Sequence, residues 1–303
     1  MNNKRSLKIF RANYQLYLML LPALMILIIF RYIPIYGVQI AFKRYNPATG
    51  IWNSPWIGFD HFQRFFNSFQ FWTLIRNTFL LKIYAILWMT PFPILIAIII
   101  NETPFARFKK FVQTIIFAPH FISVVVMVGI VFLFTNESKG IINHFLEAAG
   151  LRRIPFMIKS EWFRTVFITS NVWQNAGWNA IIYIAALAGI DVELHEAAVI
   201  DGAGRIQRIW HIDLPSIIPT FVILTLLNLG HMLAVDFEKV YLMQTALNLS
   251  VSEVIGTYTF KMGLENAQFS FAAAVGLFTN VINLVLLTIF NSTAKRTNQA
   301  SLW

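Results

Sequence analysis

Four polar and aromatic side chains within one apolar stretch of the sequence form the clearest candidate for a ligand-binding surface. They are Asn171, Gln174, Asn175 and Trp178. Their spacings of three and four residues place them on one face of a helix. Amide groups hydrogen-bond sugar hydroxyls, and an indole ring covers the apolar face of a sugar ring. The alternative is that the amides pair with neighbouring helices, as membrane helices commonly do.

Motifs for catalysis or metal binding are absent from the sequence. The phosphate loop G-x-x-x-x-G-K-[ST], the elbow G-x-S-x-G and the zinc motif H-E-x-x-H do not occur. There is no cysteine, and the six histidines lack ligand spacing. We therefore predict that the chain is not an enzyme and that it has no catalytic residues, no metal site and no cofactor of its own. Acids within the apolar runs are nearly absent, with Asp236 at the end of the fifth run the closest, which disfavours a proton-driven carrier.

The composition is that of a membrane protein. Of the 303 residues, 57% are hydrophobic and 13% are charged, whereas a soluble domain has about 25% charged residues. These values exclude an ordinary globular enzyme and an intrinsically disordered chain. The net charge of +10 is compatible with nucleic acid, but the long apolar runs indicate membrane topology instead, so we predict no nucleic-acid partner.

Six apolar runs approach the roughly 20 residues that a helix needs to cross the hydrocarbon core. They are residues 16–38, 79–100, 111–134, 166–190, 217–235 and 271–290. Strand-type alternation is absent, so the predicted fold class is all-α, a polytopic integral membrane protein with six transmembrane helices. The first run is too long for a secretory signal peptide and is not followed by a cleavage site.

Basic residues in the short flanking segments predict that both termini are cytoplasmic. The N-terminal tail, the connection between the second and third spans, and the C-terminal tail are basic; their basic residues are Lys4, Arg5, Lys8, Arg11, Arg107, Lys109, Lys110, Lys295 and Arg296. Five others fall on the opposite side, namely Lys43, Arg44, Arg152, Arg153 and Lys159. The predicted organisation is a basic tail (1–14), a first span with an outer loop (15–76), a core of five spans (77–291) and a second tail (292–303).

Two outer segments are expected to contain short helices. Residues 39–75 are rich in aromatics, and Phe59, Phe62, Phe66 and Phe69 have helical spacing. We predict an amphipathic helix in the membrane interface, with a sugar-stacking platform as the alternative. A second short helix is predicted from Gly140 to Ala149.

The connection between the fourth and fifth spans predicts a pair of short helices projecting from the bilayer. Val192–Ile200 suits the first helix, Gly202 and Gly204 allow a turn, and Arg205–Ile212 suits the second. Pro215 then begins the next span. The connection is acidic on a side that is otherwise basic, and a docking surface for another protein would explain this exception.

The spacing within this connection resembles the EAA loop of ABC importer permeases. Glu196-Ala197-Ala198 is followed after three residues by Gly202, and nine residues later by Ile212-x-Leu214-Pro215. The resemblance implies that the 191–215 loop is a cytoplasmic coupling loop that docks on an ATPase. Its implied coupling residues are Glu196, Ala197, Ala198, Asp201, Gly202, Ile212, Leu214 and Pro215. A second triplet, Glu147-Ala148-Ala149, lacks the downstream pattern and lies on the predicted outer side.

Other segments extend the resemblance over most of the chain, toward permeases for complex oligosaccharides, including lipoprotein-associated and uronate-type importers. These segments include Pro34-Ile35-Tyr36-Gly37, Trp56-Ile57-Gly58, Phe237-Glu238-Lys239-Val240-Tyr241 and Phe271-Ala272-Ala273-Ala274. The resemblance implies a multi-pass protein of the bacterial inner membrane. The implied partners are a second permease, an ATPase dimer that holds ATP and Mg, an extracytoplasmic solute-binding protein and an oligosaccharide.

In that family the helices on either side of the EAA loop line the substrate path. The resemblance therefore implies six path residues, Asn171, Gln174, Asn175, Trp178, Asn228 and His231. Arg31, Arg76 and Lys82 lie near span ends and are expected to snorkel, with uronate binding by one of them as the alternative. Two other functions remain open: an importer permease for a non-sugar solute, and a channel or carrier that works alone.

Overall fold

The computed structural model describes residues 12–233, 235–296 and 301, so most of the two predicted tails lies outside the described residues. Within these residues the regular secondary structure is helical, apart from one isolated bridge between Lys43 and Trp56. The chain divides into two compact units. The first unit comprises Met1–Phe66 and Met262–Leu277, and the second comprises Asn67–Lys261 and Phe278–Trp303.

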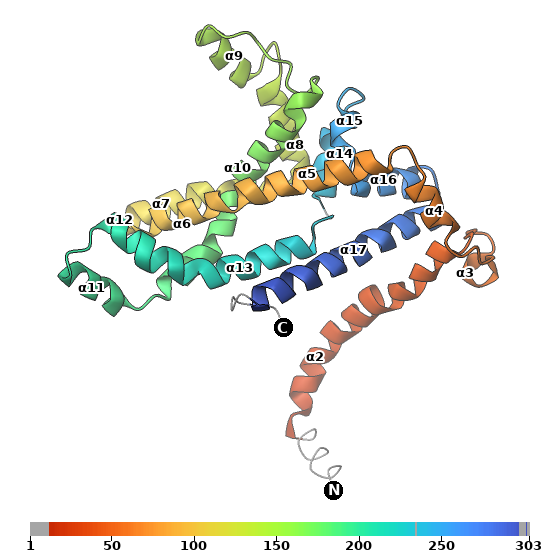
Figure 1. Cartoon of the computed structure of the whole chain (residues 1–303), viewed down its shortest axis with the longest axis horizontal. Helices are drawn as coiled ribbons and strands as arrows, with labels where there is room; N and C mark the ends of the chain where they lie inside the picture. Colours follow the sequence, from red (N-terminus) through yellow and green to blue (C-terminus); the bar gives the residue numbers. More distant parts are fainter. Residues whose placement is uncertain (1–11, 234, 297–300, 302–303) are drawn as a thin grey trace. The chain divides into compact units, whose positions relative to one another are not determined.

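Apolar helices account for each of the predicted spans (Figure 1). Four helices are long and apolar enough to cross a membrane without a sharp bend, and two further bent pairs raise the number to six. The four are Tyr14–Phe42, Phe71–Asn101, Arg205–Gly230 and Phe269–Arg296, and the bent pairs are Ala106–Phe121 with Val124–Thr135 and Ser160–Ala188 with Val192–Ile200. These helices fall at the six predicted places, which confirms the all-α membrane fold.

Within these spans the elements are α2 (Tyr14–Leu27), η1 (Ile28–Tyr32), η2 (Ile33–Phe42), α5 (Phe71–Met89), α6 (Pro91–Asn101), α7 (Ala106–Phe117), η3 (Ala118–Phe121), α8 (Val124–Thr135), α10 (Ser160–Ala188), α12 (Arg205–Arg208), η4 (Ile209–Asp213), α13 (Leu214–Gly230) and α17 (Phe269–Arg296). The connecting elements are α3 (Gly50–Asn53), α4 (Asp60–Phe66), α9 (Ile141–Ala148), α11 (Val192–Ile200), α14 (Phe237–Met243), α15 (Leu249–Ser252), α16 (Ile255–Phe260) and η5 (Lys261–Glu265).

The third span differs from the single helix expected over 111–134, because α7 and α8 meet at an angle of 100°. The break follows the 3-10 turn η3, and the Ser123 hydroxyl then caps α8 by accepting a hydrogen bond from the N–H of Val126 at 3.4 Å. A broken helix leaves backbone groups without helical partners, which is costly in a membrane. Here the carbonyl of Ile122 accepts a hydrogen bond from Gln174 Nε2 at 3.0 Å.

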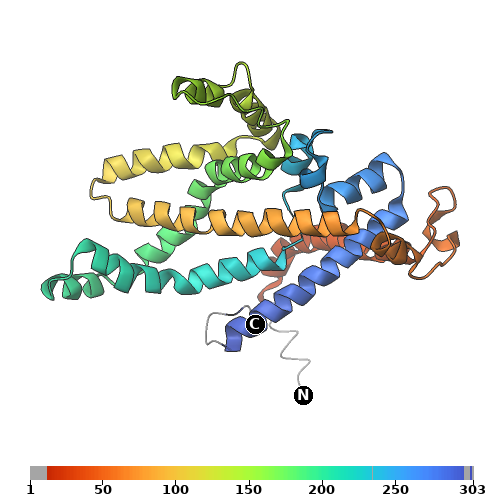
Figure 2. The same ribbon diagram turned by 45° about the horizontal axis from the view of Figure 1, so that its top comes forward.

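Helix α10 is the centre of the second unit and packs against α5, α6 and α13 (Figure 2). One cluster of buried side chains surrounds its first half and includes Phe163, Phe167 and Val240. Another cluster surrounds its last turns and includes Tyr183 and Ile217. Both clusters exclude water from the helix interfaces, so α10 is a rigid support for the polar residues on its middle turns.

The first unit contains the predicted aromatic outer loop. Its helix, α4, ends at Phe66, so Phe69 of the predicted stripe lies beyond the helix and is 91% exposed. Phe59 and Phe62 each contact the ring of Phe42, with centroids 5.4 Å apart. A short helix is confirmed here, and the second predicted outer helix is confirmed as α9.

Candidate functional site

The first helix of the 191–215 loop, α11, has the bounds that the sequence predicts. It begins where the Asp191 carboxylate accepts a hydrogen bond from the N–H of Glu193 at 3.0 Å. An acidic side chain at this position satisfies a free N–H group and also interacts favourably with the helix dipole. The start of the helix is therefore fixed locally by the sequence.

A glycine turn ends α11. The N–H of Ala203 donates to the carbonyl of Ala198 at 2.8 Å, and the N–H of Gly202 donates to the carbonyl of Val199 at 3.0 Å. This pairing is a Schellman motif, which needs a left-handed residue. Gly202 has a φ of +83°, a conformation that other residues adopt only with strain. The fixed glycine of the pattern therefore has a structural reason.

The second helix of the loop is continuous with the following span, rather than separate from it as expected. It starts at Gly204, whose N–H donates to Gln207 Oε1 at 2.7 Å. It then passes through α12 and the π-helical η4 into α13, so that Ile212, Leu214 and Pro215 lie on one helical path. Movement of the loop would therefore be transmitted directly to the fifth span.

A close contact between two titratable side chains joins the two halves of the loop. His195 Nε2 lies 3.3 Å from Asp213 Oδ1, and Asp213 is 1% exposed. A weaker contact, Arg205 Nε to Glu102 Oε2 at 4.0 Å, connects the loop to the segment that follows α6. A buried carboxylate needs such partners because its desolvation is costly. The sequence did not reveal this contact, because His195 and Asp213 are 18 positions apart and no local pattern pairs the two.

The structure places most of the predicted coupling residues at the surface. Exposed members are Glu196, Ala197, Asp201, Gly202 and Pro215. Partly exposed members are Ala198, Ile212 and Leu214. No residue of α11 is buried. The loop thus presents accessible side chains on all sides of α11, next to a turn of defined conformation.

Three of the six predicted path residues line one polar cavity of about 290 Å³. They are Asn171, Asn175 and Asn228. The cavity is also lined by Lys82 and Asp236, which sequence reasoning did not include in the path. Lys82 was expected to snorkel, with uronate binding as the alternative, and the structure places it half-buried beside these amides. The sequence does contain a signal for it, because a charged residue inside an apolar run usually has a function.

Hydrogen bonds join four side chains of this region into a directed chain. Asp236 Oδ2 accepts from Asn171 Nδ2 at 3.2 Å, and Asn171 Oδ1 accepts from Asn175 Nδ2 at 2.6 Å. Asn175 Oδ1 lies 3.0 Å from His120 Nδ1, so His120 donates there. The carboxylate orients the amides, and the helices α10, η3 and the segment after α13 are held together.

The other three predicted path residues do not line this cavity. Gln174 is buried, donates to the carbonyl of Ile122, and accepts a hydrogen bond from Lys239 Nζ at 3.2 Å. Trp178 stacks on His120, with ring centroids 4.5 Å and planes 6° apart. His231 is exposed just after the end of α13. Thus Gln174 has the role of pairing with neighbouring segments, which was the alternative for this face.

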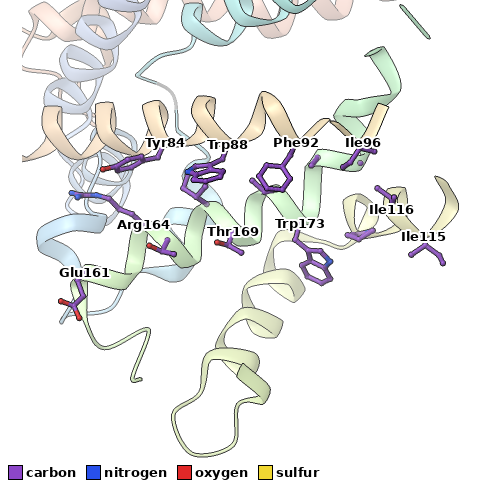
Figure 3. A pocket seen from close by; sticks show the side chains of 16 residues that line it. Tyr84, Trp88, Phe92, Ile96, Ile115, Ile116, Glu161, Arg164, Thr169 and Trp173 are labelled. Atoms are coloured by element: carbon purple, nitrogen blue, oxygen red, sulfur yellow. The ribbon is translucent and has the colours of Figure 1, made fainter. Parts of the chain in front are cut away.

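A larger cleft of about 860 Å³ lies on another side of α10 and contains none of the predicted path residues. Figure 3 shows Tyr84, Trp88 and Phe92 facing it from α5 and α6, with Trp173 on α10 opposite. Arg164 lies at the end away from the isoleucines of α7. Its volume is within the range of ligand pockets, about 300–1,000 Å³. Tyr84 and Trp88 have the i, i+4 spacing of one helix face, and this spacing was the signal in the sequence for an aromatic wall of the cleft.

Comparisons with known proteins agree with this architecture. Residues 94–299 match the family described as "Binding-protein-dependent transport system inner membrane component". The chain is 41% identical over 288 residues to protein LplB of Bacillus subtilis (strain 168), covering 95% of this chain and 91% of LplB. It is 40% identical over 297 residues to the polygalacturonan/rhamnogalacturonan transport system permease protein YteP of the same organism, covering 98% and 92%.

A solved structure is also similar along nearly the whole chain. A crystal structure of a bacterial ABC transporter involved in the import of the acidic polysaccharide alginate contains a chain that is 41% identical, with a TM-score of 0.89. The match covers 96% of this chain and 99% of that chain. A second structure of a bacterial alginate ABC transporter, in complex with an alginate pentasaccharide-bound periplasmic protein, gives the same TM-score at 39% identity. The chain belongs to the family of inner membrane components of binding-protein-dependent transport systems.

Proposed function

We propose that this chain is the permease subunit of an ABC importer and forms half of the transmembrane path for an oligosaccharide. A second, homologous permease completes the path, and an extracytoplasmic solute-binding protein delivers the sugar. A cytoplasmic ATPase dimer binds ATP and Mg²⁺ and docks on the 191–215 loop, so both termini are cytoplasmic in a bacterial inner membrane. ATP hydrolysis in the partner drives alternating access, and this chain performs no chemistry on the sugar.

The observation that carries the proposal is the apolar surface that α11 leaves uncovered. Four of its large apolar side chains are between 54% and 85% exposed, namely Val192, Leu194, Val199 and Ile200. Such a patch is typical of a protein interaction site. Glu196 on the same helix and Asp201 directly after it are also exposed, which favours a partner with basic groups.

The polar cavity supports an oligosaccharide as the transported solute. Its amides suit the hydroxyl groups of a sugar. Transport also requires a site that binds the solute weakly enough to release it. The names of YteP and of the similar alginate transporter also specify sugar polymers as the transported solutes. We therefore place the path along Asn171, Asn175 and Asn228.

The coupling role is tested by reversing one charge in the loop. In proteoliposomes that contain the full complex, Glu196→Lys should abolish sugar-stimulated ATP hydrolysis and uptake while membrane insertion stays intact. The matched control is Glu147→Lys, which reverses the same residue type in the other Glu-Ala-Ala triplet and should change neither activity. Normal coupling in Glu196→Lys, or sugar uptake by this chain without an ATPase, would remove the importer interpretation.

The path is tested at Asn228. Among the described residues, its Nδ2 donates only within its own helix, to the carbonyl of Leu224 at 3.0 Å. Asn228→Leu therefore removes a cavity amide without breaking a bond between helices. We expect reduced uptake with unchanged assembly of the complex. Thr288→Val is the control, because the Thr288 hydroxyl also bonds its own helix, to the carbonyl of Leu284 at 2.8 Å, outside the cavity. Equal uptake by both variants would exclude Asn228 from the path.

A further inference from the structure

The ammonium group of Lys82 lines the polar cavity but takes no part in its hydrogen-bond network. Lys82 lies on α5, within the second predicted span, and lines the cavity while half-buried. Among residues 12–233 and 235–296, it has no hydrogen-bond partner and no carboxylate oxygen within 4.0 Å. A cation inside a membrane span normally pairs or serves a function, because its burial is costly.

Asp236 is the nearest candidate to neutralise Lys82, but its carboxylate is shared. It accepts the hydrogen bond from Asn171 and interacts electrostatically with both Lys82 and Lys239. Lys239 is buried and its ammonium donates to Gln174, so it is not accessible from the cavity. Two positive charges therefore face one negative charge, which leaves a local charge of +1 and one accessible cation, Lys82, in the described part of the cavity.

The remaining lining of the cavity complements this cation. Asn175, Asn179 and Asn228 are neutral amides on two different helices, α10 and α13. Amides suit hydroxyl groups, whereas an ammonium forms stronger, charge-assisted hydrogen bonds with a carboxylate. The volume of about 290 Å³ is at the low end for a ligand pocket, so it admits part of an oligosaccharide at a time.

We propose that Lys82 binds a carboxylate of the passing substrate, so that the polar cavity selects oligosaccharides containing uronic acids over neutral ones. The inference rests on the proposed permease function and assigns Lys82 as a specificity-determining residue. It requires that the substrate carboxylate supplies the counter-charge that Asp236 does not.

The test measures direct binding to the complete complex in nanodiscs of neutral lipid, without the solute-binding protein, so that only the permease path selects. The probes are trigalacturonate, its fully methyl-esterified form and maltotriose, compared by calorimetry. Wild-type complex should bind the acid best. Lys82→Gln should weaken trigalacturonate binding about tenfold, the typical contribution of one charge-assisted hydrogen bond, and leave the ester unchanged. Lys82→Arg should retain the preference.

A second variant tests the same charge effect without changing Lys82, in case substitution of Lys82 impairs folding. Asn179→Asp cancels the local charge and leaves Lys82 in place, so it should weaken binding of the acid but not of maltotriose. Lys139→Gln removes an equal charge from the exposed outer segment and should have no effect, which controls for overall charge.

The outcomes separate the two proposals. If the wild type binds the ester as well as the acid, or if Lys82→Gln weakens all three probes equally, the selective role of Lys82 is wrong while the permease function stands. If adding anionic phosphatidylglycerol to the nanodiscs displaces the acid by occupying Lys82, the cation is a lipid site and the inference fails. Absence of binding for every sugar would contradict the proposed function itself.

Discussion

The triplet Glu-Ala-Ala occurs twice in this chain, and its two copies have different surroundings. Glu147-Ala148-Ala149 ends α9, and the Glu147 carboxylate accepts a hydrogen bond from Arg153 Nη2 at 2.7 Å. This bond holds the pKa of the Glu147 carboxyl below its usual range. Glu196-Ala197-Ala198 lies inside α11, and within the described residues the Glu196 carboxylate has no such partner.

A left-handed glycine follows each triplet, directly in the first copy and after three residues in the second, so the presence of such a glycine does not distinguish them. Gly150 has a φ of +76° and Gly202 a φ of +83°. The two copies differ in the element beyond the glycine: the chain after Gly202 continues as a helix into a span, whereas the chain after Gly150 is a short non-helical segment. The function of a Glu-Ala-Ala triplet therefore depends on the element that follows it, and only the second copy is joined by a helix to a membrane span.

The largest expected effect comes from proline at the two glycines. Proline has a φ near −65° and no N–H, so Gly202→Pro is incompatible with the native φ and loses the bond to the carbonyl of Val199. Sugar-stimulated ATP hydrolysis by the reconstituted complex should fall to the basal rate. Gly150→Pro carries a similar backbone strain and should preserve coupling. Equal losses in both variants would show that general destabilisation, not docking, is responsible.

The next largest effect is expected from the exposed apolar side chains of α11, compared with those of α9. Ile200 is 85% exposed on α11 and Phe145 is 71% exposed on α9. Burial of one such side chain contributes roughly 1.5–3 kcal/mol, so Ile200→Asp should weaken capture of the ATPase about tenfold or more, as measured by pull-down at graded concentrations. Phe145→Asp should leave capture unchanged. Unaltered capture by Ile200→Asp would place the ATPase contact elsewhere.

A smaller effect is expected from the contact between His195 and Asp213, which joins α11 to the helix that leads into the fifth span. Asp213→Asn removes the charge that His195 approaches, while keeping the size of the side chain. We expect a several-fold loss of coupling, equivalent to about 1 kcal/mol, with the ATPase still bound. His195→Gln should give a similar loss, and the double variant should add little. Additive losses would mean that the two residues act independently.

The smallest effect is expected at Glu147 itself. Because its pKa is lowered in the folded chain, its interaction with Arg153 is present above the unfolded pKa and is lost as pH falls through the folded value. Protection of the α9 amides against hydrogen exchange, corrected for the intrinsic exchange rate at each pH, should therefore fall at acidic pH, and Glu147→Gln should remove this pH dependence. Transport should not change. An effect of Glu147→Gln on coupling would break the distinction between the triplets.

Helix positions and the loop hairpin were predictable because their signals are local. Apolar runs of sufficient length identify the spans, and capping residues with a glycine determine α11 to the residue. The grouping of Asn171, Asn175 and Asn228 was partly predictable from helical spacing and from the resemblance. The break before Ser123 and the pairing role of Gln174 were not, because the bond to Ile122 joins residues 52 positions apart.

The sequence by itself determined that this is a helical membrane protein without a recognisable catalytic motif, carrying an acidic hairpin between two of its spans. Periodicity, hydropathy and turn residues act over a few positions, so they can be read without the fold. Only the tertiary structure decided that Lys82 and Asp236 share a polar cavity and that His195 contacts Asp213. Such contacts depend on how distant helices pack, and their energies are set by burial that no local pattern reports.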